Sequence, residues 1–403
     1  MKRKLKVGVV GASISNSPDG RERFAVRAHV PALKALSDLY EVTAICTSKI
    51  ETATAAAKHF DVPHAYDHID RMLNDRPELD VVCVSVNPAM HHRLVMPALR
   101  AGKHVYCEQA LGLNTAEAQE AYDLAHSKGL RTVVGHQYHY EPAVLQLVEM
   151  VKDGYIGKPL SFNITYLVSA HIAPRPSHRT WLFSSESCGH PGFRSAHSLE
   201  RLVSVLGDVT DICADIEVLV PDRPNLDGGP PLHTTQANNL NYLMRVGDGS
   251  VMGTLQVCLT AWFGLGWGLQ VYGTEGMLML GVKDTGPKDT VKGDPDSGEL
   301  RLYGARIDMP KLMANPTAPE LFQRQFKEIT PSAKHYFVTG IDRNRATFPV
   351  AQLWHSFAHA IDEGRECAPS FRDELKLHCV MDAAEASTKD RRWVKVDYSR
   401  IRG

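Results

Sequence analysis

A strand-helix-strand pattern in the first third of the chain constrains the fold more than any other feature. Apolar runs at residues 80–86 and 105–111 flank a helical pattern at residues 89–102. Two strands joined by one helix form parallel neighbours in a sheet. Ligands of parallel sheets bind beyond the carboxyl ends of the strands. We therefore expect cofactor and substrate near the polar residues that end these two runs, Asn87, Glu108 and Gln109.

The same alternation of strands and helices extends to both sides of this pattern. It predicts an α/β fold, with a doubly wound parallel sheet over residues 1–135. The further strands are expected at residues 5–10, 40–46 and 130–135, and the further helices at residues 25–39, 51–60 and 115–128.

Residues 136–403 show a second pattern, in which apolar and polar residues alternate along several strands. This pattern predicts an α+β domain with a large open sheet and two helices near the end of the chain. A length of 403 residues also exceeds one ordinary hydrophobic core. The strands are expected at residues 160–169, 211–218, 239–246, 251–259 and 269–280, and the helices at residues 143–153, 349–363 and 372–387.

The composition argues against several classes of protein. The formal net charge is −1, so no basic surface predicts nucleic acid or a membrane as a partner. No apolar stretch approaches the roughly 20 residues of a membrane span, and the first strand is not preceded by a secretory leader pattern. The eight cysteines are scattered without C-x-x-C spacing, which is typical of buried, reduced thiols. We expect a soluble, cytoplasmic protein.

The first strand ends in a glycine turn, Gly11-Ala12-Ser13, ahead of the helix at residues 25–39. A strand, a glycine turn and a helix form the opening of a dinucleotide site, where backbone N–H groups bind the pyrophosphate. The motif is incomplete because Ser13 stands where a second glycine belongs, and an ordinary strand turn is the alternative. Residues 14–23 have the character of an insertion that forms a lid over the cofactor.

The end of the second strand bears on the choice of cofactor. A ribose 2′-hydroxyl is usually bound by an acidic residue at this position, whereas a 2′-phosphate needs hydrogen-bond donors and a cation. The sequence here is Thr47-Ser48-Lys49, which contains no acid. It favours NADP over NAD as the cofactor. The alternative is that Lys49 is a solvated lysine at the start of a helix.

These motifs resemble, in the same order, the glucose-fructose oxidoreductase, inositol dehydrogenase and MocA (Gfo/Idh/MocA) family of NAD(P)-dependent oxidoreductases. The segments that carry the family likeness are Gly8-Val9-Val10-Gly11, His29-Val30-Pro31-Ala32-Leu33, Asn87-Pro88 with His91, Ala101-Gly102-Lys103-His104-Val105, Glu108, Gly154-Tyr155-Ile156-Gly157, His197 and Tyr272-Gly273-Thr274-Glu275-Gly276. Within the family, the chain is most similar to the branch of the fungal galactose-regulon repressor. That likeness rests on Ser48-Lys49-Ile50-Glu51-Thr52, Val95-Met96-Pro97, Glu108-Gln109-Ala110-Leu111 and Gly154-Tyr155-Ile156-Gly157.

The resemblance implies a Rossmann domain followed by a substrate domain with a large mixed sheet. It also implies a homodimer or homotetramer, because relatives commonly associate through the open face of that sheet. The cofactor contacts that it implies come from Asn87, Pro88, His91, Glu108 and Gln109.

Two departures from the family concern catalysis. Members that oxidise sugars carry Glu-Lys-Pro where this chain has Glu108-Gln109-Ala110, and an aspartate where it has Phe193. His197, which matches the proton-transferring histidine of the family, is retained. The resemblance therefore implies either a dehydrogenase with a different proton relay or a nucleotide-sensing regulator without turnover.

We predict an NADP(H)-dependent oxidoreductase that transfers hydride to or from a carbinol or carbonyl carbon of a small polyhydroxylated or cyclic substrate. A dihydrodiol of an aromatic acid is the alternative substrate. Histidine suits proton transfer near neutral pH, and the candidate catalytic residues are His197, Tyr138, His139 and Gln109.

Other candidate histidines of the second domain include His136, His171 and His190, for which a structural or solvent-facing role is the alternative. Phe193 is expected to lower the pKa of His197, because an apolar neighbour disfavours the cation. No histidine spacing predicts a metal site.

Overall fold

The amino-terminal part of the chain forms a six-stranded parallel sheet with the strand order β3-β2-β1-β4-β5-β6. The computed structural model describes residues 3–14, 23–175, 181–282, 300–317, 326–343 and 346–401, so most of the expected lid at 14–23 lies outside the described residues. The strand order reverses beside β1, as in a doubly wound sheet, and the predicted fold class is confirmed. The strands are β1 (Leu5–Val10), β2 (Tyr40–Cys46), β3 (His64–Tyr66), β4 (Val81–Val84), β5 (His104–Cys107) and β6 (Thr132–Val134).

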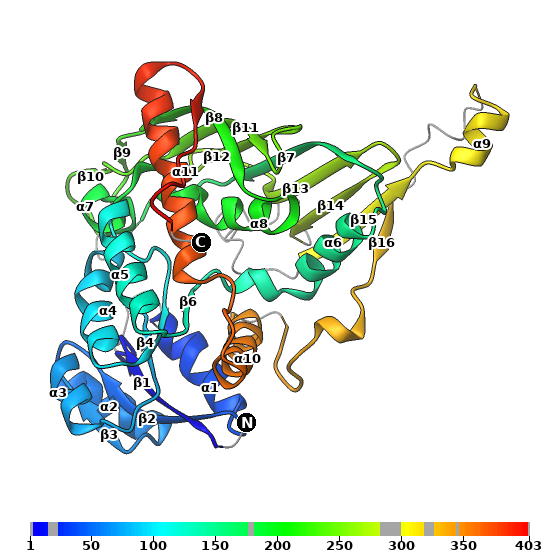
Figure 1. Ribbon diagram of the computed structural model, residues 1–403. Helices are drawn as coiled ribbons and strands as arrows, with labels where there is room; N and C mark the ends of the chain where they lie inside the picture. Colours follow the sequence, from blue (N-terminus) through cyan, green and yellow to red (C-terminus); the bar gives the residue numbers. More distant parts are fainter. Residues whose placement is uncertain are drawn as a thin grey trace.

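Helices bury both faces of this sheet (Figure 1). Successive residues of β4 point to opposite faces, so Cys83 belongs to the core under α1 and α2, whereas Val82 and Val84 belong to the core under α3, α4 and α5. Burial on both faces explains why the strands are continuous apolar runs. The helices are η1 (Ala25–His29), α1 (Val30–Ala35), α2 (Ile50–Phe60), α3 (Ile69–Asp75), η2 (Pro88–Met90), α4 (His91–Arg100) and α5 (Thr115–Ser127).

The second sheet has nine strands in the order β16-β15-β14-β13-β7-β12-β11-β8-β17. It is mixed, because β7 and β12 run parallel and the other paired strands are antiparallel. The strands are β7 (Pro159–Leu167), β8 (Val209–Glu217), β11 (Asn239–Val246), β12 (Val251–Cys258), β13 (Gly266–Gly273), β14 (Gly276–Val282), β15 (Leu300–Arg306), β16 (Lys327–Ile329) and β17 (Val394–Lys395).

Three helices cover one face of the nine-stranded sheet and leave the other face open (Figure 1). They are α6 (Pro142–Lys152), α8 (Ala196–Leu206) and α11 (Phe371–Asp390). The shorter elements of this part of the chain are η3 (Gln137–Tyr140), α7 (Ser185–Cys188), η5 (Pro191–Ser195), β9 (Asp222–Arg223), β10 (Leu232–His233), α9 (Met309–Ala314) and η9 (Ala333–His335).

The single strand expected at residues 269–280 is wrong, because this segment is a hairpin of β13 and β14. The chain turns at Thr274 and Glu275, between Gly273 and Gly276. A Cβ atom at Gly273 would lie 2.3 Å from Ile156 O, so the turn can approach the backbone only with glycine there. Apolar residues lie on both sides of the turn, and the prediction of one strand passed over the turn signal Gly273-Thr274-Glu275-Gly276.

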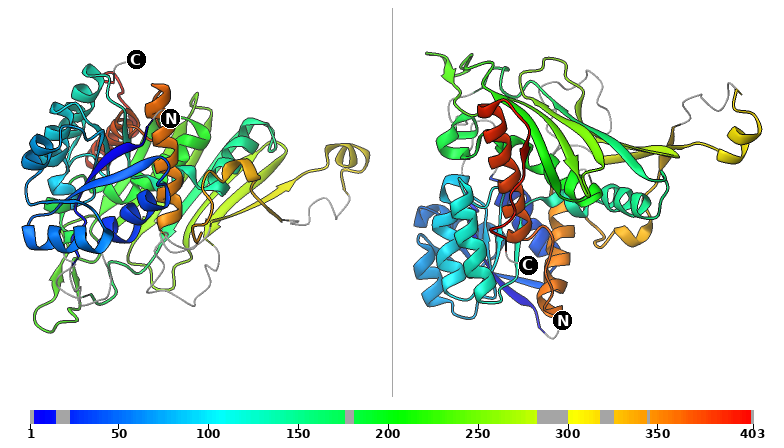
Figure 2. Two further views of the ribbon diagram at one scale, coloured as in Figure 1. Left: turned by 90° about the horizontal axis from the view of Figure 1, so that it is seen from below. Right: turned by 45° about the horizontal axis from the view of Figure 1, so that its top comes forward.

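The last two long helices connect the two sheets. Helix α10 (Thr347–Glu363) packs on α1 beside the Rossmann strands and shares their hydrophobic core, as the views in Figure 2 also show. Its Trp354 is fully buried, and Tyr40 donates a hydrogen bond to Trp354 O at 2.7 Å. Helix α11 begins at a capping box of Ser370 and Asp373 and packs against β8 and α5. Side chains from the end of the chain therefore reach the edge of the first sheet.

Two general features of the chain follow from the same coordinates. All eight cysteines are free thiols, and six of them are buried. Within the described ranges, no helix is long and apolar enough to cross a lipid bilayer.

Candidate functional site

The carboxyl ends of β1 and β4 approach each other closely at Gly11. Its φ angle is +105°, and a Cβ atom there would lie 2.1 Å from Ser85 O. Gly11 N–H also donates to Cys46 O at the end of β2, at 2.9 Å. Only glycine fits this cradle, which is the local requirement of a dinucleotide turn. Ala12 is buried behind it, and Ser13 is half-buried.

The end of β2 presents two free polar side chains. Thr47 is engaged within its own loop, because its hydroxyl donates to Lys49 O at 2.8 Å and lies 2.7 Å from Thr52 Oγ1. Ser48 and Lys49 are exposed and have no side-chain partner among the described residues. They stand at the start of α2, where backbone N–H groups are also unpaired.

His91 holds together the loops that follow β4 and β5. The ring is fully buried, with Nδ1 2.5 Å from Ala110 O and Nε2 3.2 Å from Val86 O. Burial lowers the pKa of His91, so the ring is neutral and donates to one of these two carbonyls. Beside it, Asn87 Oδ1 accepts from Ala89 N–H at 3.0 Å and caps η2, with Pro88 buried in its first turn.

Glu108 is fixed by a histidine and an indole. His29 Nε2 lies 2.8 Å from Glu108 Oε1, and Trp354 Nε1–H donates to His29 Nδ1 at 3.1 Å. Because the indole can only donate, Nδ1 of His29 must accept. Nε2 of His29 therefore carries the hydrogen and donates a hydrogen bond to Glu108 Oε1. Gly135 makes room for this carboxylate, since a Cβ atom there would lie 2.4 Å from Oε1.

The side-chain amide of Gln109 has the properties of a ligand-binding group. It is 9% exposed, and its Nε2 is buried without a hydrogen-bond partner in the described part of the chain. Such unpaired buried donors are rare in folded proteins and need an explanation. The next residue, Ala110, packs with Cys188 and Phe193 in a small apolar cluster, which accounts for phenylalanine in place of an aspartate at position 193.

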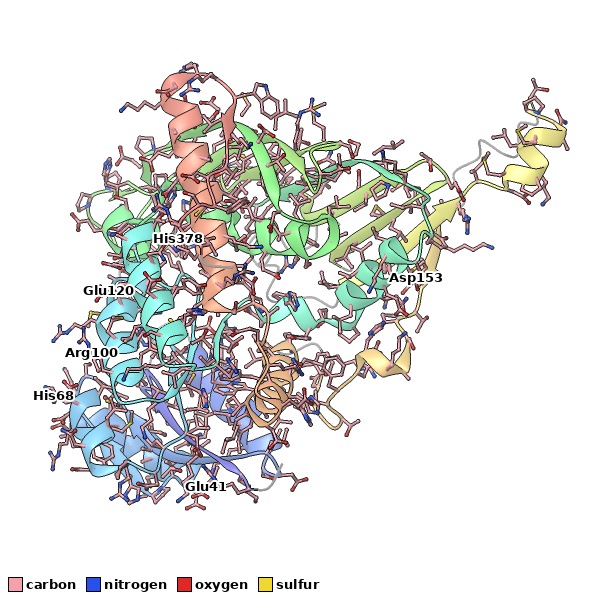
Figure 3. The ribbon with its side chains drawn as sticks, viewed as in Figure 1. Glu41, His68, Arg100, Glu120, Asp153 and His378 are labelled. Atoms are coloured by element: carbon pink, nitrogen blue, oxygen red, sulfur yellow. The ribbon has the colours of Figure 1, made fainter. Side chains whose placement is uncertain are left out.

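A chain of three side chains ends at His197. His136 Nδ1 lies 2.9 Å from His197 Nδ1, and His136 Nε2 lies 2.7 Å from Glu374 Oε2. Glu374 is 0% exposed and His136 is 1% exposed, whereas His197 is half-buried. His136 follows β6, His197 lies in the first turn of α8, and Glu374 lies on α11 one turn before His378, which Figure 3 labels. We call these three residues the relay.

The ionised carboxylate of Glu374 determines which ring nitrogens of His136 and His197 carry a hydrogen. An ionised carboxylate only accepts, so Glu374 accepts from His136 Nε2–H. His136 Nδ1 must then accept from His197 Nδ1–H, which leaves a lone pair on His197 Nε2. That atom has no protein partner among the residues that the structure describes.

The pKa values agree with this arrangement. Burial is the main cause that lowers the pKa of His197 well below 6.5, and the neighbouring basic side chains His136, Arg201 and Arg194 lower it further, in the direction expected from Phe193. Burial alone would raise the pKa of Glu374, but its contact with His136 outweighs burial and lowers it below 4.5. A neutral His197 and an ionised Glu374 coexist at neutral pH.

His139 and Tyr138 do not join the relay. His139 Nδ1 lies 2.5 Å from Glu200 Oε1. The ring of Tyr138 is buried in the core of the second domain, with the Arg201 guanidinium 4.8 Å from its centroid. Among the four candidate catalytic residues, the structure thus brings His197 to the relay and leaves Gln109 nearby.

The relay lies beside residues 108–110, which follow the carboxyl end of β5. Glu108 packs on Gly135, the residue before His136, and Ala110 packs on Phe193, one helical turn before His197. Glu374 was not predicted from the sequence. The available signal was a glutamate and a histidine, Glu374 and His378, on the face of the last helix that is otherwise apolar. No group of three or more potential metal ligands occurs within the described residues.

Comparisons with known proteins match this architecture. A model described as an oxidoreductase family with an NAD-binding Rossmann fold matches residues 5–136, and a GFO/IDH/MocA C-terminal domain matches residues 144–279. Levoglucosan dehydrogenase of Pseudarthrobacter phenanthrenivorans is 23% identical over 378 residues, which cover 87% of this chain and 88% of that protein.

Two solved structures share the whole fold. Levoglucosan dehydrogenase in complex with NADH and levoglucosan has a TM-score of 0.78 at 23% identity, with 98% of this chain and 99% of that chain covered. A super-repressor mutant of Gal80p from Saccharomyces cerevisiae has a TM-score of 0.79 at 18% identity, with 99% and 100% covered. Similarity at these identities shows the fold. The two domain matches, which together span most of the sequence, show that the chain belongs to the Gfo/Idh/MocA oxidoreductase family.

Proposed function

We propose that this protein is an NADP(H)-dependent oxidoreductase that transfers hydride to or from a carbinol or carbonyl carbon of a small, sugar-like polyhydroxylated or cyclic substrate. The observation that supports it most is the relay, because it leaves the lone pair of His197 Nε2 unpaired in a half-buried position. A neutral histidine with an oriented lone pair is the general base that oxidation of an alcohol requires.

The residues of the chain divide the proton chemistry between them. In oxidation, His197 Nε2 accepts the proton of the substrate hydroxyl. Glu374 stabilises the resulting imidazolium through His136 without taking the proton itself, as the carboxylate of a catalytic triad does. Bound NADP supplies the hydride acceptor or donor. In reduction, His197 returns the proton to the carbonyl oxygen.

Gln109 supports this chemistry less strongly than a lysine would. Its buried, unpaired Nε2–H can donate a hydrogen bond to the reacting oxygen. A neutral amide offers less stabilisation to a developing alkoxide than an ammonium group, because hydrogen bonds from charged donors are stronger. His197 and the relay must therefore supply more of the rate.

The cofactor fits the edge of the first sheet. The cradle at Gly11, where a Cβ atom would meet Ser85 O, suits a pyrophosphate, and the free Ser48 and Lys49 suit a 2′-phosphate. The remaining residues proposed to contact it are Ala12, Ser13, Thr47, Asn87, Pro88, His91, Glu108 and Gln109.

The proposed preference for NADP is tested by replacing Lys49 with alanine. Loss of a charge-assisted phosphate contact should weaken NADPH by roughly 1.5 to 3 kcal/mol and leave NADH nearly unchanged. Fluorescence titration with both cofactors measures this, and Lys58→Ala at the far end of α2 is a matched control. Equal loss for NADPH and NADH would contradict a role at the 2′-phosphate.

The second candidate function is regulation without turnover. It is favoured by Gln109 and Phe193, which replace two catalytic positions of the family, and by the likeness of the fold to Gal80p. Turnover decides between the two. Purified protein with NADP or NADPH and a panel of polyols, sugars, sugar acids, sugar phosphates and aldehydes should show a change in the absorbance of the reduced nicotinamide. NADPH binding without any turnover across the panel would favour the regulator.

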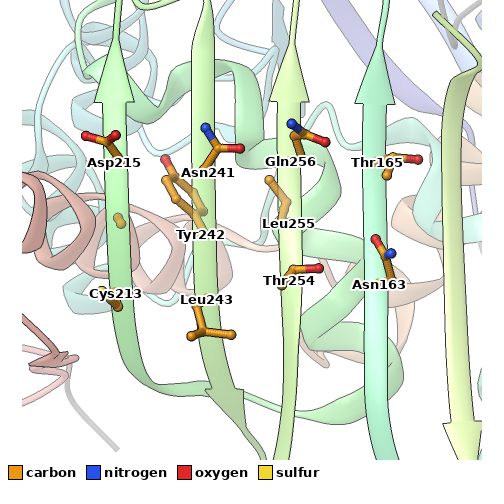
Figure 4. Close-up of a pocket in the computed structure, with 11 residues that line it drawn as sticks. Asn163, Thr165, Cys213, Asp215, Asn241, Tyr242, Leu243, Thr254, Leu255 and Gln256 are labelled. Carbon is orange, nitrogen blue, oxygen red and sulfur yellow. The ribbon is translucent and has the colours of Figure 1, made fainter.

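The open face of the nine-stranded sheet is the proposed contact with a second copy of the chain. Its outward residues are mostly uncharged, as the close-up of its shallow pocket shows for Asn163, Thr165, Asn241, Thr254 and Gln256 (Figure 4). Lys and Glu are depleted at the centre of protein interfaces, so such a face suits a homodimer, or a pair of dimers in a homotetramer. Light scattering measures the mass. Gln256→Lys at the centre of this face should shift a dimer toward monomer.

A further inference from the structure

A group of three cationic or basic side chains lies beside the relay. Arg194 lies in η5, three residues before His197, whereas Arg223 lies in β9 and His171 follows β7. Arg223 and His171 are each 1% exposed, and Arg194 is half-buried like His197. We call Arg194, Arg223 and His171 the cationic cluster.

All three side chains of the cationic cluster contact Leu182 or Phe183. The Arg223 guanidinium lies over the ring of Phe183, and the centroid of the His171 ring is 4.4 Å from the centroid of the same ring. Arg194 Nη2 donates to Leu182 O at 2.6 Å. Within the described part of the chain, no carboxylate forms an ion pair with Arg194, Arg223 or His171.

Several side-chain nitrogen atoms of the cluster lack partners among the described residues. Nε and Nη2 of Arg223, Nε of Arg194 and Nδ1 of His171 are buried without a hydrogen-bond partner among the described residues. Arg223 has one side-chain bond, from Nη1 to Thr234 Oγ1 at 3.2 Å. Buried charges are normally paired, because burial removes their hydration. These groups are therefore arranged for a partner that the described residues do not provide.

The electrostatics of the cluster agrees with a missing anion. Burial, and then the charges of Arg175 and Arg194, lower the pKa of Arg223 to about 10. Burial and the same kind of repulsion, from Arg194, Arg223 and Arg175, lower the pKa of His171 well below 6.5. Arg194 also acts on His197, so the cluster and the relay share one electrostatic environment.

We propose that the substrate is an anion, whose carboxylate or phosphate binds Arg223 and Arg194 while a carbinol of the same molecule faces His197. This inference rests on the proposed function, because it names the substrate class of the same site. Guanidinium groups bind carboxylate and phosphate through paired N–H donors, which matches the two free N–H groups of Arg223.

The first test compares sugars that differ at C6, which carries a hydroxyl, a carboxylate or a phosphate. Calorimetric titration of the full-length, NADPH-saturated protein with D-glucose, D-glucuronate and D-glucose 6-phosphate should show one anion binding at least about tenfold more tightly than glucose. A preference for glucuronate identifies a carboxylate, and a preference for glucose 6-phosphate identifies a phosphate. Glucose that binds as tightly as both anions overturns the proposal.

The second test removes the cluster. Arg223→Met and Arg194→Gln should each reduce the preference for the anion by about tenfold, whereas Arg71→Met, at a side chain on α3 that is 69% exposed, should keep it. Because the charge of Arg223 lacks a partner, Arg223→Met should melt no lower than the parent protein in anion-free buffer. An anion preference that survives Arg194→Gln overturns the proposal, whatever Arg223→Met does to folding.

Failure of this inference can be distinguished from failure of the proposed function. Turnover of neutral polyols with no preference for anions keeps the oxidoreductase and overturns the anion site. Anion binding that depends on Arg194, without turnover of any ligand, keeps the anion site and overturns the oxidoreductase. Inorganic phosphate that raises the melting temperature while neither sugar anion is preferred marks an adventitious ion only, and overturns the substrate assignment.

Discussion

Two neighbouring histidine pairs join the end of the first sheet to helix α8, and they differ in what they can do. His136 pairs with His197, and His139 pairs with Glu200, and the partners of each pair lie 61 positions apart in the sequence. The repeat arises because residues three apart lie on the same face of a helix. The contacts are 2.9 Å and 2.5 Å long, so geometry alone does not separate the pairs.

We call His139 with Glu200 the outer pair, and His136 with His197 the inner pair. The difference between the two pairs is the position of the carboxylate. In the outer pair, Glu200 contacts His139 directly, and its charge outweighs burial to raise the pKa of His139, while the pKa of Glu200 falls. That pair is a closed ion pair. In the inner pair, Glu374 contacts His136, and His197 keeps a lowered pKa and a free Nε2. Where a carboxylate contacts a histidine directly, as Glu200 contacts His139, the histidine becomes a cation. Where a second histidine lies between them, as His136 lies between Glu374 and His197, the last histidine stays neutral and can act as a base.

The largest effect is expected from His197→Ala, which removes the terminal base of the inner pair. The kcat should fall by roughly 10²- to 10⁴-fold, the usual contribution of general acid-base catalysis, with NADPH affinity nearly unchanged. Steady-state kinetics and cofactor titration measure both quantities. An active enzyme whose rate is indifferent to this change would remove His197 from the proton relay.

Glu374→Gln should have the next largest effect, because Glu374 is a positioning residue. The amide can donate to His136 Nε2, which reverses the tautomers of the relay and places a hydrogen on His197 Nε2. The kcat should fall by about 10- to 100-fold, the range for loss of a group that orients a functional histidine. Since Glu374 is fully buried, a melting curve must accompany the kinetics. A variant that is folded and fully active would contradict the relay.

The pH dependence of kcat sharpens the same comparison. With the pKa of His197 well below 6.5, oxidation should be flat near neutral pH and should fall only at lower pH, as His197 becomes protonated. Removal of the negative charge in Glu374→Gln disfavours the imidazolium, so the acid limb should move to still lower pH. An acid limb at the same pH in both proteins would mean that Glu374 does not act on His197.

The smallest effect on turnover is expected from Glu200→Gln in the outer pair. The kcat should stay within about twofold, but loss of one partner of a buried pair should cost roughly 3–5 kcal/mol of stability. Glu120→Gln, in an exposed pair with His92, is the control and should cost at most about 1 kcal/mol. Denaturant unfolding measures both.

The stability loss in Glu200→Gln should depend on pH in a defined way. His139 has a raised pKa, so its contribution is full below 6.5 and is lost as pH rises through that raised value. Glu200 has a lowered pKa, so its contribution is full above 4.5 and is lost as pH falls through that lowered value. The difference from the parent protein should therefore be largest between pH 4.5 and 6.5. A difference that does not vary with pH would argue against an ion pair.

Much of the fold follows from the sequence because its signals are local. The strand at Tyr40–Cys46 has the predicted bounds, since an apolar run of that length can be buried on both faces of a parallel sheet. The same logic predicts that Gly11, Asn87 and Glu108 share one edge, because parallel strands end on the same side. The β13–β14 hairpin was missed because apolar residues stand on both sides of its turn and only a short segment, residues 273–276, separates them.

The sequence by itself determined the Rossmann sheet, the family and the candidacy of His197, because each is encoded in residues close together along the chain. Only the tertiary structure decided which carboxylate acts on His197 through His136. Glu374 lies 238 residues from His136 and reaches it because α11 packs against the edge of the first sheet. It likewise decided that Arg194 and Arg223 lie at the adjacent residues Leu182 and Phe183, with no carboxylate in an ion pair with either among the described residues. Which distant residues contact one another depends on how the helices pack. The hydrophobic periodicity of the sequence does not predict these contacts.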